Sequence, residues 1–270
     1  MEKQVTLLID GHIHIYPHYK LTLAIKNGIS NLYKSAKESD SFDNSQKQIP
    51  VWMLVERYDC NFFDQIVNET SLSINGYTLQ AAGDGTTIIV MEKNEPVLYI
   101  FAGRQLVTKE NLEILSLISP FNLNDREYSI EEVIEKVNEN GGVPALNWAP
   151  GKWFFSRGEI VKTVLNKYSP DRLLIGDTSL RTEIWSMPRL MSQARDRNYK
   201  IVAGSDPLPF EDEEHQIGKY GFAVSASFDE AKPAESMRNI LRDTKLPFNF
   251  IGNRNSLFTF SRRQFKIMTA

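Results

Sequence analysis

Short apolar runs and amphipathic stretches alternate along this chain. Residues 5–9 form an aliphatic run that predicts a buried strand, and residues 51–55 predict a second one. Between them, apolar side chains recur at helical spacing over residues 19–37, and the polar segment 38–47 is expected to be a surface loop. A further helix is expected to begin within residues 60–67. The chain therefore begins with alternating strands and helices.

The pattern changes between residues 77 and 102. Three strand-like runs, at 77–82, 86–91 and 97–101, are separated by turn-like residues and have no helix between them. They predict an antiparallel β meander inserted into an otherwise alternating chain. The pattern does not decide whether this meander covers the body of the protein or forms an oligomer interface.

Strand and helix units alternate again from residue 129 onward. Ser129 and Glu132 have the spacing of a capping box, which predicts a helix that begins at Ile130. Strand-like runs follow at 143–146, 172–175 and 199–203, with helical patterns at 157–167 and 188–197. This rhythm is typical of parallel strands and predicts an α/β barrel or a doubly wound sheet.

The composition narrows the class of protein. The 270 residues, 41% of them hydrophobic, suffice for one domain over 1–270, with the β insertion at 77–102 and a C-terminal extension at 222–270. A net charge of −3 without a basic block argues against a nucleic-acid partner. The single cysteine, Cys60, excludes a disulfide framework and a cysteine-rich zinc site. Because no signal peptide or membrane span is visible, we expect a cytoplasmic protein without a membrane partner. The oligomeric state is left open.

The segment Asp10-Gly-His12-Ile-His14 directly follows the first predicted strand. Because side chains alternate along an extended backbone, His12 and His14 are expected to point the same way. Two adjacent imidazoles beyond a strand end are a common way to hold a transition metal. Asp10 is then a candidate acceptor that orients an imidazole. The alternative is that both are ordinary loop histidines.

Further polar residues fall where other predicted strands end, and parallel strands would gather them at one edge. They are Glu56, Arg57, Arg104, Gln105, Asn147, Asp177 and Asp206. Carboxylates and imidazoles in such positions can build a metal-assisted hydrolase. The alternative is that several of them cap the next helix. That alternative is favoured for Asp177, because Thr178 and Ser179 follow it.

Four blocks of the chain, taken in order, resemble the polymerase-and-histidinol-phosphatase (PHP) superfamily of metal-dependent phosphoesterases. The blocks are Asp10-Gly-His-Ile-His14, the run from Gly103-Arg-Gln105 to Glu113, the helix and Gly-Gly-Val-Pro-Ala-Leu run before Asn147, and Gly204-Ser-Asp206. The resemblance extends to Gly221 and implies a distorted (β/α)7 barrel with two or three divalent ions at the strand ends. It also implies hydrolysis of a phosphate ester.

Several positions depart from the family pattern, and each departure removes or alters a metal ligand. The replacements are Glu56 for Asp, Arg57 for His, Gln105 for Glu, Glu113 for His, Asn147 for His and Leu208 for His. Because so many replacements are neutral or cationic, a three-metal cluster is not expected.

The reduced ligand set comprises two imidazoles and one carboxylate: His12, His14 and Asp206. It suits one or two ions of zinc, manganese or iron. Glu56 and Glu113 are candidate substitute ligands. His215 is a candidate fourth ligand or proton donor, although a solvated loop position is its simpler interpretation.

Cationic side chains near the same strand ends suit an anionic substrate. Arg57 and Arg104 are expected to stabilise developing negative charge, or else to pair with Glu56 or Asp206 in place of lost metal charge. Substrate contacts are expected from three loop cations: Lys152, Arg157 and Arg181. Nearby aromatic residues form either a wall for a sugar or nucleoside ring or ordinary packing: Trp148, Trp153, Phe154 and Phe155.

Together these features predict a metal-dependent hydrolase of the PHP-like class that acts on a small anionic phosphate ester. Asp206 or Glu56 would accept a proton from water. The alternative is a catalytically inactive barrel that binds an anionic metabolite or a protein partner, which the replaced ligands favour. An amidohydrolase-like enzyme is a third hypothesis, but it would need a lysine or two further histidines at strand ends, and the sequence offers none there.

Overall fold

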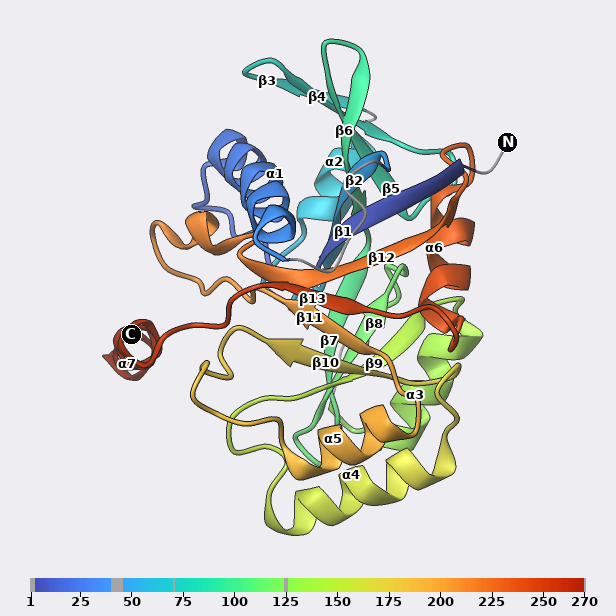
Figure 1. The fold of residues 1–270 in the computed structure, drawn as a ribbon, viewed down its shortest axis with the longest axis vertical. Helices are drawn as coiled ribbons and strands as arrows, with labels where there is room; N and C mark the ends of the chain where they lie inside the picture. Colours follow the sequence, from blue (N-terminus) through green and yellow to red (C-terminus); the bar gives the residue numbers. More distant parts are fainter. Residues whose placement is uncertain (1–2, 40–45, 70, 124–125, 270) are drawn as a thin grey trace.

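The computed structural model describes residues 3–39, 46–69, 71–123 and 126–269. Within them, two β-sheets are flanked by seven α-helices (Figure 1). Residues 40–45 of the expected surface loop lie outside the described part of the chain. Among the described residues, no helix combines the length and the apolar character that a bilayer crossing requires.

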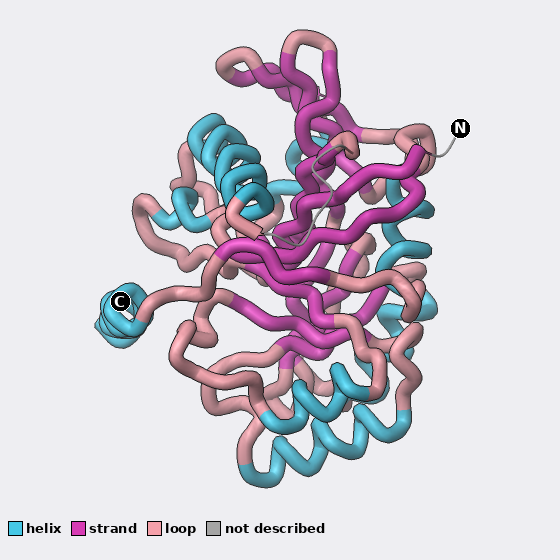
Figure 2. The backbone as a smooth tube through the Cα atoms, in the orientation of Figure 1, coloured by secondary structure: helices cyan, strands magenta, loops and turns pink. Residues whose placement is uncertain are grey.

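The first sheet has eight strands and holds the N-terminal strand near its centre. Its order is β13 (Asn249–Gly252), β12 (Tyr220–Phe228), β1 (Lys3–Ile13), β2 (Gln48–Leu54), β6 (Glu95–Phe101), β5 (Thr87–Glu92), β4 (Tyr77–Ala81) and β3 (Ser71–Ile74). β1, β2 and β6 run parallel, whereas β12 lies antiparallel beside β1. The meander strands β4, β5 and β6 are confirmed. β3 is a fourth strand that the sequence pattern did not reveal, and with β4 it projects from the body (Figure 2).

The second sheet has five strands and does not continue the parallel pattern. Its order is β11 (Ile201–Gly204), β10 (Leu174–Thr178), β9 (Val143–Asn147), β8 (Glu113–Leu117) and β7 (Gly103–Val107). β9, β10 and β11 run parallel, but β8 is antiparallel to both of its neighbours. The loop 108–112 between β7 and β8 is too short for the crossover that parallel strands need. Neither sheet closes on itself, so the structure shows a mixed α/β fold, and the expected distorted (β/α)7 barrel is not shown.

The two sheets nevertheless meet along two seams. Where β1 passes β11, the Asp206 backbone N–H donates to the His12 carbonyl at 2.9 Å. Where β2 ends beside β7, the Glu56 N–H donates to the Gly103 carbonyl, also at 2.9 Å. The first seam requires Gly204, because a Cβ there would lie 2.2 Å from the His12 nitrogen. Strand ends from both sheets are therefore brought to one place.

Apolar side chains from both sheets fill the space between them, among them Leu7, Met53, Phe101, Leu115, Leu174 and Phe222. Helices cover the outer faces: α1 (Leu21–Lys37) and α2 (Phe62–Asn68) on the first sheet, α3 (Ile130–Glu139), α4 (Phe155–Lys167) and α5 (Arg189–Asp196) on the second. α6 (Pro233–Arg242) packs against the core between the sheets. Burial on both faces explains why the strands are continuous apolar runs in the sequence.

The predicted helices occur close to the expected residues, and the capping box that begins α3 is confirmed. The Ser129 hydroxyl accepts from the Glu132 N–H at 3.4 Å, and the Glu132 carboxylate accepts from the Ser129 N–H at 2.7 Å. The elements that sequence analysis missed are β3, β7, β8, β12, β13, α6 and α7 (Leu257–Thr269). α7 lies at the edge of the molecule in Figure 1.

Candidate metal centre

Three side chains meet at the seam between β1 and β11. His12 lies in the last residues of β1 and His14 directly follows the strand. Their Nε2 atoms are 3.1 Å apart, and each lies 3.6 Å from Asp206 Oδ1. The structure therefore brings together the whole reduced ligand set. In the described part of the chain, no other three His, Cys, Asp or Glu side chains gather so closely.

The triangle formed by these ligand atoms fits a divalent ion. Tetrahedral bonds of about 2.0–2.1 Å separate neighbouring ligand atoms by roughly 3.4 Å, and the three separations here are 3.1, 3.6 and 3.6 Å. Metal-binding histidines usually donate their second ring N–H to an acceptor. Here the Nδ1 atoms of His12 and His14 are buried, and neither has a partner among the described residues. The donor set suits a metal, but the usual supporting acceptors are missing.

The protonation states also suit a metal ligand set. Burial lowers the pKa of His12 to about 4, although Asp206 opposes this shift, so the imidazole is neutral at pH 7. Burial alone would raise the pKa of Asp206, but His12, His14 and Arg263 outweigh it and hold that pKa well below its ordinary value. A neutral imidazole and an ionised carboxylate are the forms that bind metal.

Asp10 shapes the seam and does not orient an imidazole. Its two carboxylate oxygens accept from the backbone N–H groups of Ser205 at 2.9 Å and Gly218 at 2.8 Å. Burial raises its pKa to about 6, and these hydrogen bonds oppose the rise. Asp10 therefore ties β1 to the segment that carries Asp206, which adopts a left-handed φ of 50°.

Glu56 and Arg104 lie at the second seam and face α2. Glu56 Oε1 accepts from the Phe62 N–H at 2.5 Å, and its Oε2 lies 3.6 Å from the Arg104 guanidinium. Arg104 also donates to Asp64 at 2.9 Å. Glu56 therefore serves as an acceptor for the first amides of α2, with Arg104 as its counter-ion. Neither residue belongs to the group formed by the histidines and Asp206.

Asp177 does not cap a helix, which corrects the favoured sequence interpretation. Arg181 donates to both carboxylate oxygens of Asp177, at 2.8 and 2.6 Å, and the Tyr220 hydroxyl donates at 2.9 Å. Both partners of the ion pair are buried. Arg181 was expected to contact substrate, but it is held in this internal bidentate pair. The sequence analysis did not suggest that Asp177 and Arg181, four residues apart, would pair.

A cavity of about 480 Å³ opens near the metal centre, although His12, His14 and Asp206 do not line it. Gln105 and Glu113 line it, and both lie close enough to His12 to raise its pKa. Glu113 accepts from Lys152 Nζ at 2.7 Å and from Asn147 Nδ2 at 2.9 Å. The cavity is also lined by three cations: Arg57, Arg126 and Lys152.

The remaining predicted residues are placed outside this cluster. His215 lies in a 3₁₀ helix, and its Nδ1 is 2.7 Å from Asn27 Nδ2. Arg157 donates to the Gly151 carbonyl at 2.8 Å and so fixes the loop before α4. His215 does not join the ligand group.

Sequence reasoning missed two cations near the centre, Arg126 and Arg263. Arg126 lies in the segment before α3 and lines the cavity. Arg263 lies in α7 and donates to the Asp206 carbonyl at 2.7 Å. Neither residue stands at a predicted strand end, so no signal in the pattern marked it.

No family model and no curated protein matches this chain. Among solved structures, PsfC from Pseudomonas syringae is similar, with 14% identity and a TM-score of 0.47 over 89% of this chain and 98% of that one. A two-domain protein from Bacteroides vulgatus, described as containing a predicted PHP-like metal-dependent phosphoesterase, has 11% identity and a TM-score of 0.46 over 97% of this chain and 70% of that one.

Proposed function

We propose that this protein is a metal-dependent phosphoesterase of the PHP-like class that hydrolyses a small anionic phosphate ester. The observation that carries the proposal is the triangle of His12, His14 and Asp206 beside a cationic cavity. The sequence blocks that resemble the PHP superfamily supply these same three residues. The two seams, which gather strand ends from both sheets, are compatible with a distorted and incompletely closed PHP-like barrel.

One zinc, manganese or iron ion would be held by the two Nε2 atoms and the Asp206 carboxylate. As a Lewis acid it would polarise a phosphoryl oxygen and make water more acidic. The chain's own cations would bind the phosphate oxygens. Arg126 can donate two parallel hydrogen bonds, and Lys152 supplies a point charge. Arg57 can donate as well, although its guanidinium also pairs with Asp59 at 3.1 Å.

We assign proton acceptance to Glu113, in preference to Asp206 and Glu56. Glu56 is engaged by α2 and Arg104, and the lowered pKa of Asp206 makes its carboxylate a weak base. Glu113 lines the cavity and lies near His12, and Lys152 and Asn147 fix its two oxygens. A water proton would pass to one of these oxygens.

A second candidate function is the binding of an anionic metabolite without catalysis. This binding function is favoured by the ion pair between Lys152 and Glu113, because a carboxylate paired with Lys152 is a poorer base. The neutral side chains of Gln105 and Asn147 beside the centre also favour it.

The test is the metal content of untagged protein, purified without chelator and measured by plasma mass spectrometry, beside His12→Ala. His215→Ala is the matched control, because His215 contacts Asn27 and lies outside the ligand group. We expect metal in the wild type and in the control but not in His12→Ala, and hydrolysis of 4-nitrophenyl phosphate that follows the metal. Absence of metal after reconstitution, with retained binding of inorganic phosphate, would favour the second candidate.

A further inference from the structure

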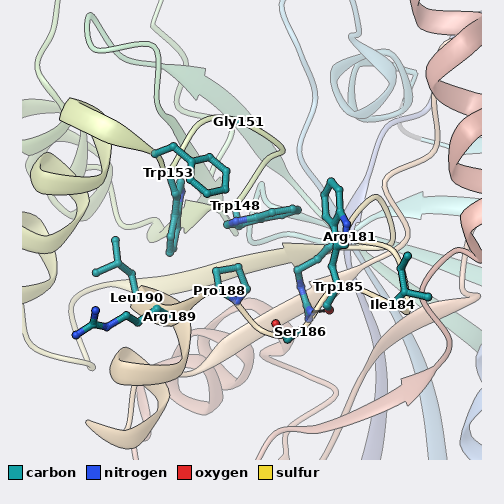
Figure 3. A pocket seen from close by; sticks show the side chains of 11 residues that line it. Trp148, Gly151, Trp153, Arg181, Ile184, Trp185, Ser186, Pro188, Arg189 and Leu190 are labelled. Atoms are coloured by element: carbon teal, nitrogen blue, oxygen red, sulfur yellow. Dashed lines mark hydrogen bonds between the residues drawn. The ribbon is translucent and has the colours of Figure 1, made fainter.

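An aromatic cleft of about 550 Å³ opens at the ends of β9 and β10, apart from the cationic cavity. Figure 3 shows Trp148 and Trp153 facing Pro188 and Leu190, with Trp185 beyond them. This volume is typical of small-molecule sites.

The cleft is partly open and its walls are fixed from behind. Trp185 is 38% exposed, yet its carbonyl accepts from Arg181 at 3.0 Å and from Arg254 at 2.8 Å. Its ring packs edge-on against Trp148, with the ring centroids 6.0 Å apart. Trp153 donates its indole N–H to the Asn147 carbonyl at 3.0 Å. Trp148 and Trp153 are buried, so the walls around the partly exposed Trp185 are already ordered, and little side-chain entropy remains to be lost on binding.

One cation at this cleft has no internal partner. Within the described residues, the exposed Arg189 side chain makes no hydrogen bond or ion pair, whereas Arg181 is held by Asp177. The flat indole faces suit an aromatic ring, and Arg189 suits a negative charge attached to it. We propose that the cleft binds a planar aromatic anion. This site does not depend on the proposed phosphoesterase activity.

The test uses 1-naphthyl phosphate with the metal-free full chain, followed by tryptophan fluorescence and equilibrium dialysis. We expect saturable quenching, roughly tenfold weaker binding in Trp185→Ala, and weaker binding in Arg189→Ala. Phe258→Ala and Arg195→Ala are controls, because they remove another exposed aromatic and another cation of α5. Binding by both cleft variants at the wild-type affinity would overturn the proposal, as would no binding by the wild type or full competition by inorganic phosphate.

A second inference concerns α7, which inserts one cation behind the metal centre. Arg263 is 2% exposed, although Phe258 and Phe265 on the same helix are 79% and 67% exposed. Its guanidinium donates to the Asp206 carbonyl and to Glu213 Oε2, both at 2.7 Å. A buried arginine on the same helix as these exposed side chains indicates a specific role for its contacts.

Among the described residues, the three hydrogen bonds of the Arg263 side chain all restrain the loop that carries Asp206. Glu213, its ion-pair partner, also accepts from the Leu208 N–H at 3.2 Å. Ser179 accepts from Arg263 at 3.2 Å and donates to the Ser205 carbonyl at 2.6 Å. The residues on both sides of Asp206 are thus anchored to the same guanidinium.

This restraint matters because Asp206 has a left-handed φ of 50°, which is uncommon for residues other than glycine. In that conformation its carboxylate faces both imidazoles. We infer that Arg263 is a positioning residue, through which docking of α7 holds Asp206 in its metal-binding geometry. The inference rests on the proposed metal centre.

The test is zinc affinity of the full chain, measured by competition with a chromophoric chelator. We expect Arg263→Ala to bind zinc roughly 10- to 100-fold more weakly, as expected for a group that orients a ligand. Arg262→Ala, an exposed neighbour on α7, should bind zinc as the wild type does. Glu213→Gln, which removes the ion-pair partner of Arg263, provides a milder variant if Arg263→Ala fails to fold.

The outcomes distinguish failure of the positioning role of Arg263 from failure of the metal centre. Zinc binding by the wild type with equal affinity in Arg263→Ala and Glu213→Gln would overturn the positioning role and leave the metal centre standing. No zinc binding by the wild type would overturn the metal centre, and the role of Arg263 with it.

Discussion

The neighbouring parallel strands β10 and β11 carry aspartates at their ends in opposite surroundings. Asp177 is fully buried, and Arg181 and Tyr220 donate three hydrogen bonds to its carboxylate. The Asp206 side chain is 14% exposed, and its Oδ1 faces two imidazoles at 3.6 Å. The same residue type at adjacent strand ends thus neutralises an internal cation in one case and remains available for an external one in the other.

The carboxylate at the end of β2 has an internal counter-charge, as Asp177 does. Glu56 is 1% exposed, lies beside Arg104 and accepts from the first amides of α2. Two strand ends are therefore closed by internal partners, whereas the seam at Asp206 holds an open set of ligand atoms. The same conservative substitution, carboxylate to amide, tests this contrast at each position.

Asp206→Asn should have the largest effect on metal binding. The substitution keeps the shape but removes the charge and one good oxygen ligand, so zinc affinity should fall by more than the roughly 10- to 100-fold that loss of an orienting group costs. Chelator competition measures this directly. Unchanged affinity would mean that Asp206 is not a ligand.

Asp177→Asn should instead reduce stability. It leaves the Arg181 guanidinium buried without its counter-charge, which costs about 3–5 kcal/mol of the free energy of unfolding. Urea denaturation gives the loss, and zinc affinity of the folded fraction should match the wild type. A loss smaller than that of Asp206→Asn in the metal-free protein would contradict the contrast between the two strand ends.

Glu56→Gln should have a smaller effect of the same kind. The amide keeps one acceptor oxygen for the Phe62 N–H, but its charge no longer balances Arg104, which retains Asp64 as a partner. We expect a loss of about 1–2 kcal/mol in the free energy of unfolding. Metal content should not change; if it falls to zero, Glu56 belongs to the ligand set.

The sequence predicted the individual strands and helices better than the way in which the strands pair into sheets. Apolar runs and the Ser129 capping box depend on nearest neighbours along the chain, and the structure confirms them. The α/β class was predicted, but a distorted (β/α)7 barrel is not shown, because β8 reverses direction after a short loop, β12 returns antiparallel beside β1, and neither sheet closes. Those pairings depend on long-range contacts that periodicity does not encode.

In the candidate site, too, the residues set by local pattern were predicted, whereas those set by long-range contacts were mostly not. Alternation along β1 correctly predicted that His12 and His14 would share a face, and the Gly-Ser-Asp block supplied Asp206. Pairing of Arg104 with Glu56 was one of the two alternatives that the sequence offered, and the structure has that pair. The pairing of Asp177 with Arg181 was not predicted, because its partner lies on the following loop. Arg263 comes from a helix that the sequence analysis did not predict.

The reactivity of the Cys60 thiol should report on the strand end that Glu56 and Arg104 close, and here we expect the smallest effect on stability. Its carbonyl accepts from Arg104 at 2.9 Å, its side chain is 2% exposed, and burial raises the pKa of the thiol from 9.0 to about 12. At pH 8 the folded protein should therefore hold roughly a thousandfold less thiolate than the unfolded chain, and iodoacetamide should react far more slowly without urea than with it.

The contribution of Cys60 to the free energy of unfolding should fall as the pH rises. Because the folded pKa is the higher one, the unfolded thiol ionises first, and the contribution of Cys60 to stability is complete below pH 9 and is lost as the pH rises towards 12. The alkylation rate at pH 8 should not respond to zinc, since Cys60 lies on the side closed by Glu56 and Arg104 and not at the histidines. In Glu56→Gln the rate should rise, because the contacts that fix Arg104 over Cys60 are weakened. A rate that follows zinc but not Glu56→Gln would show that the two strand ends are coupled rather than distinct.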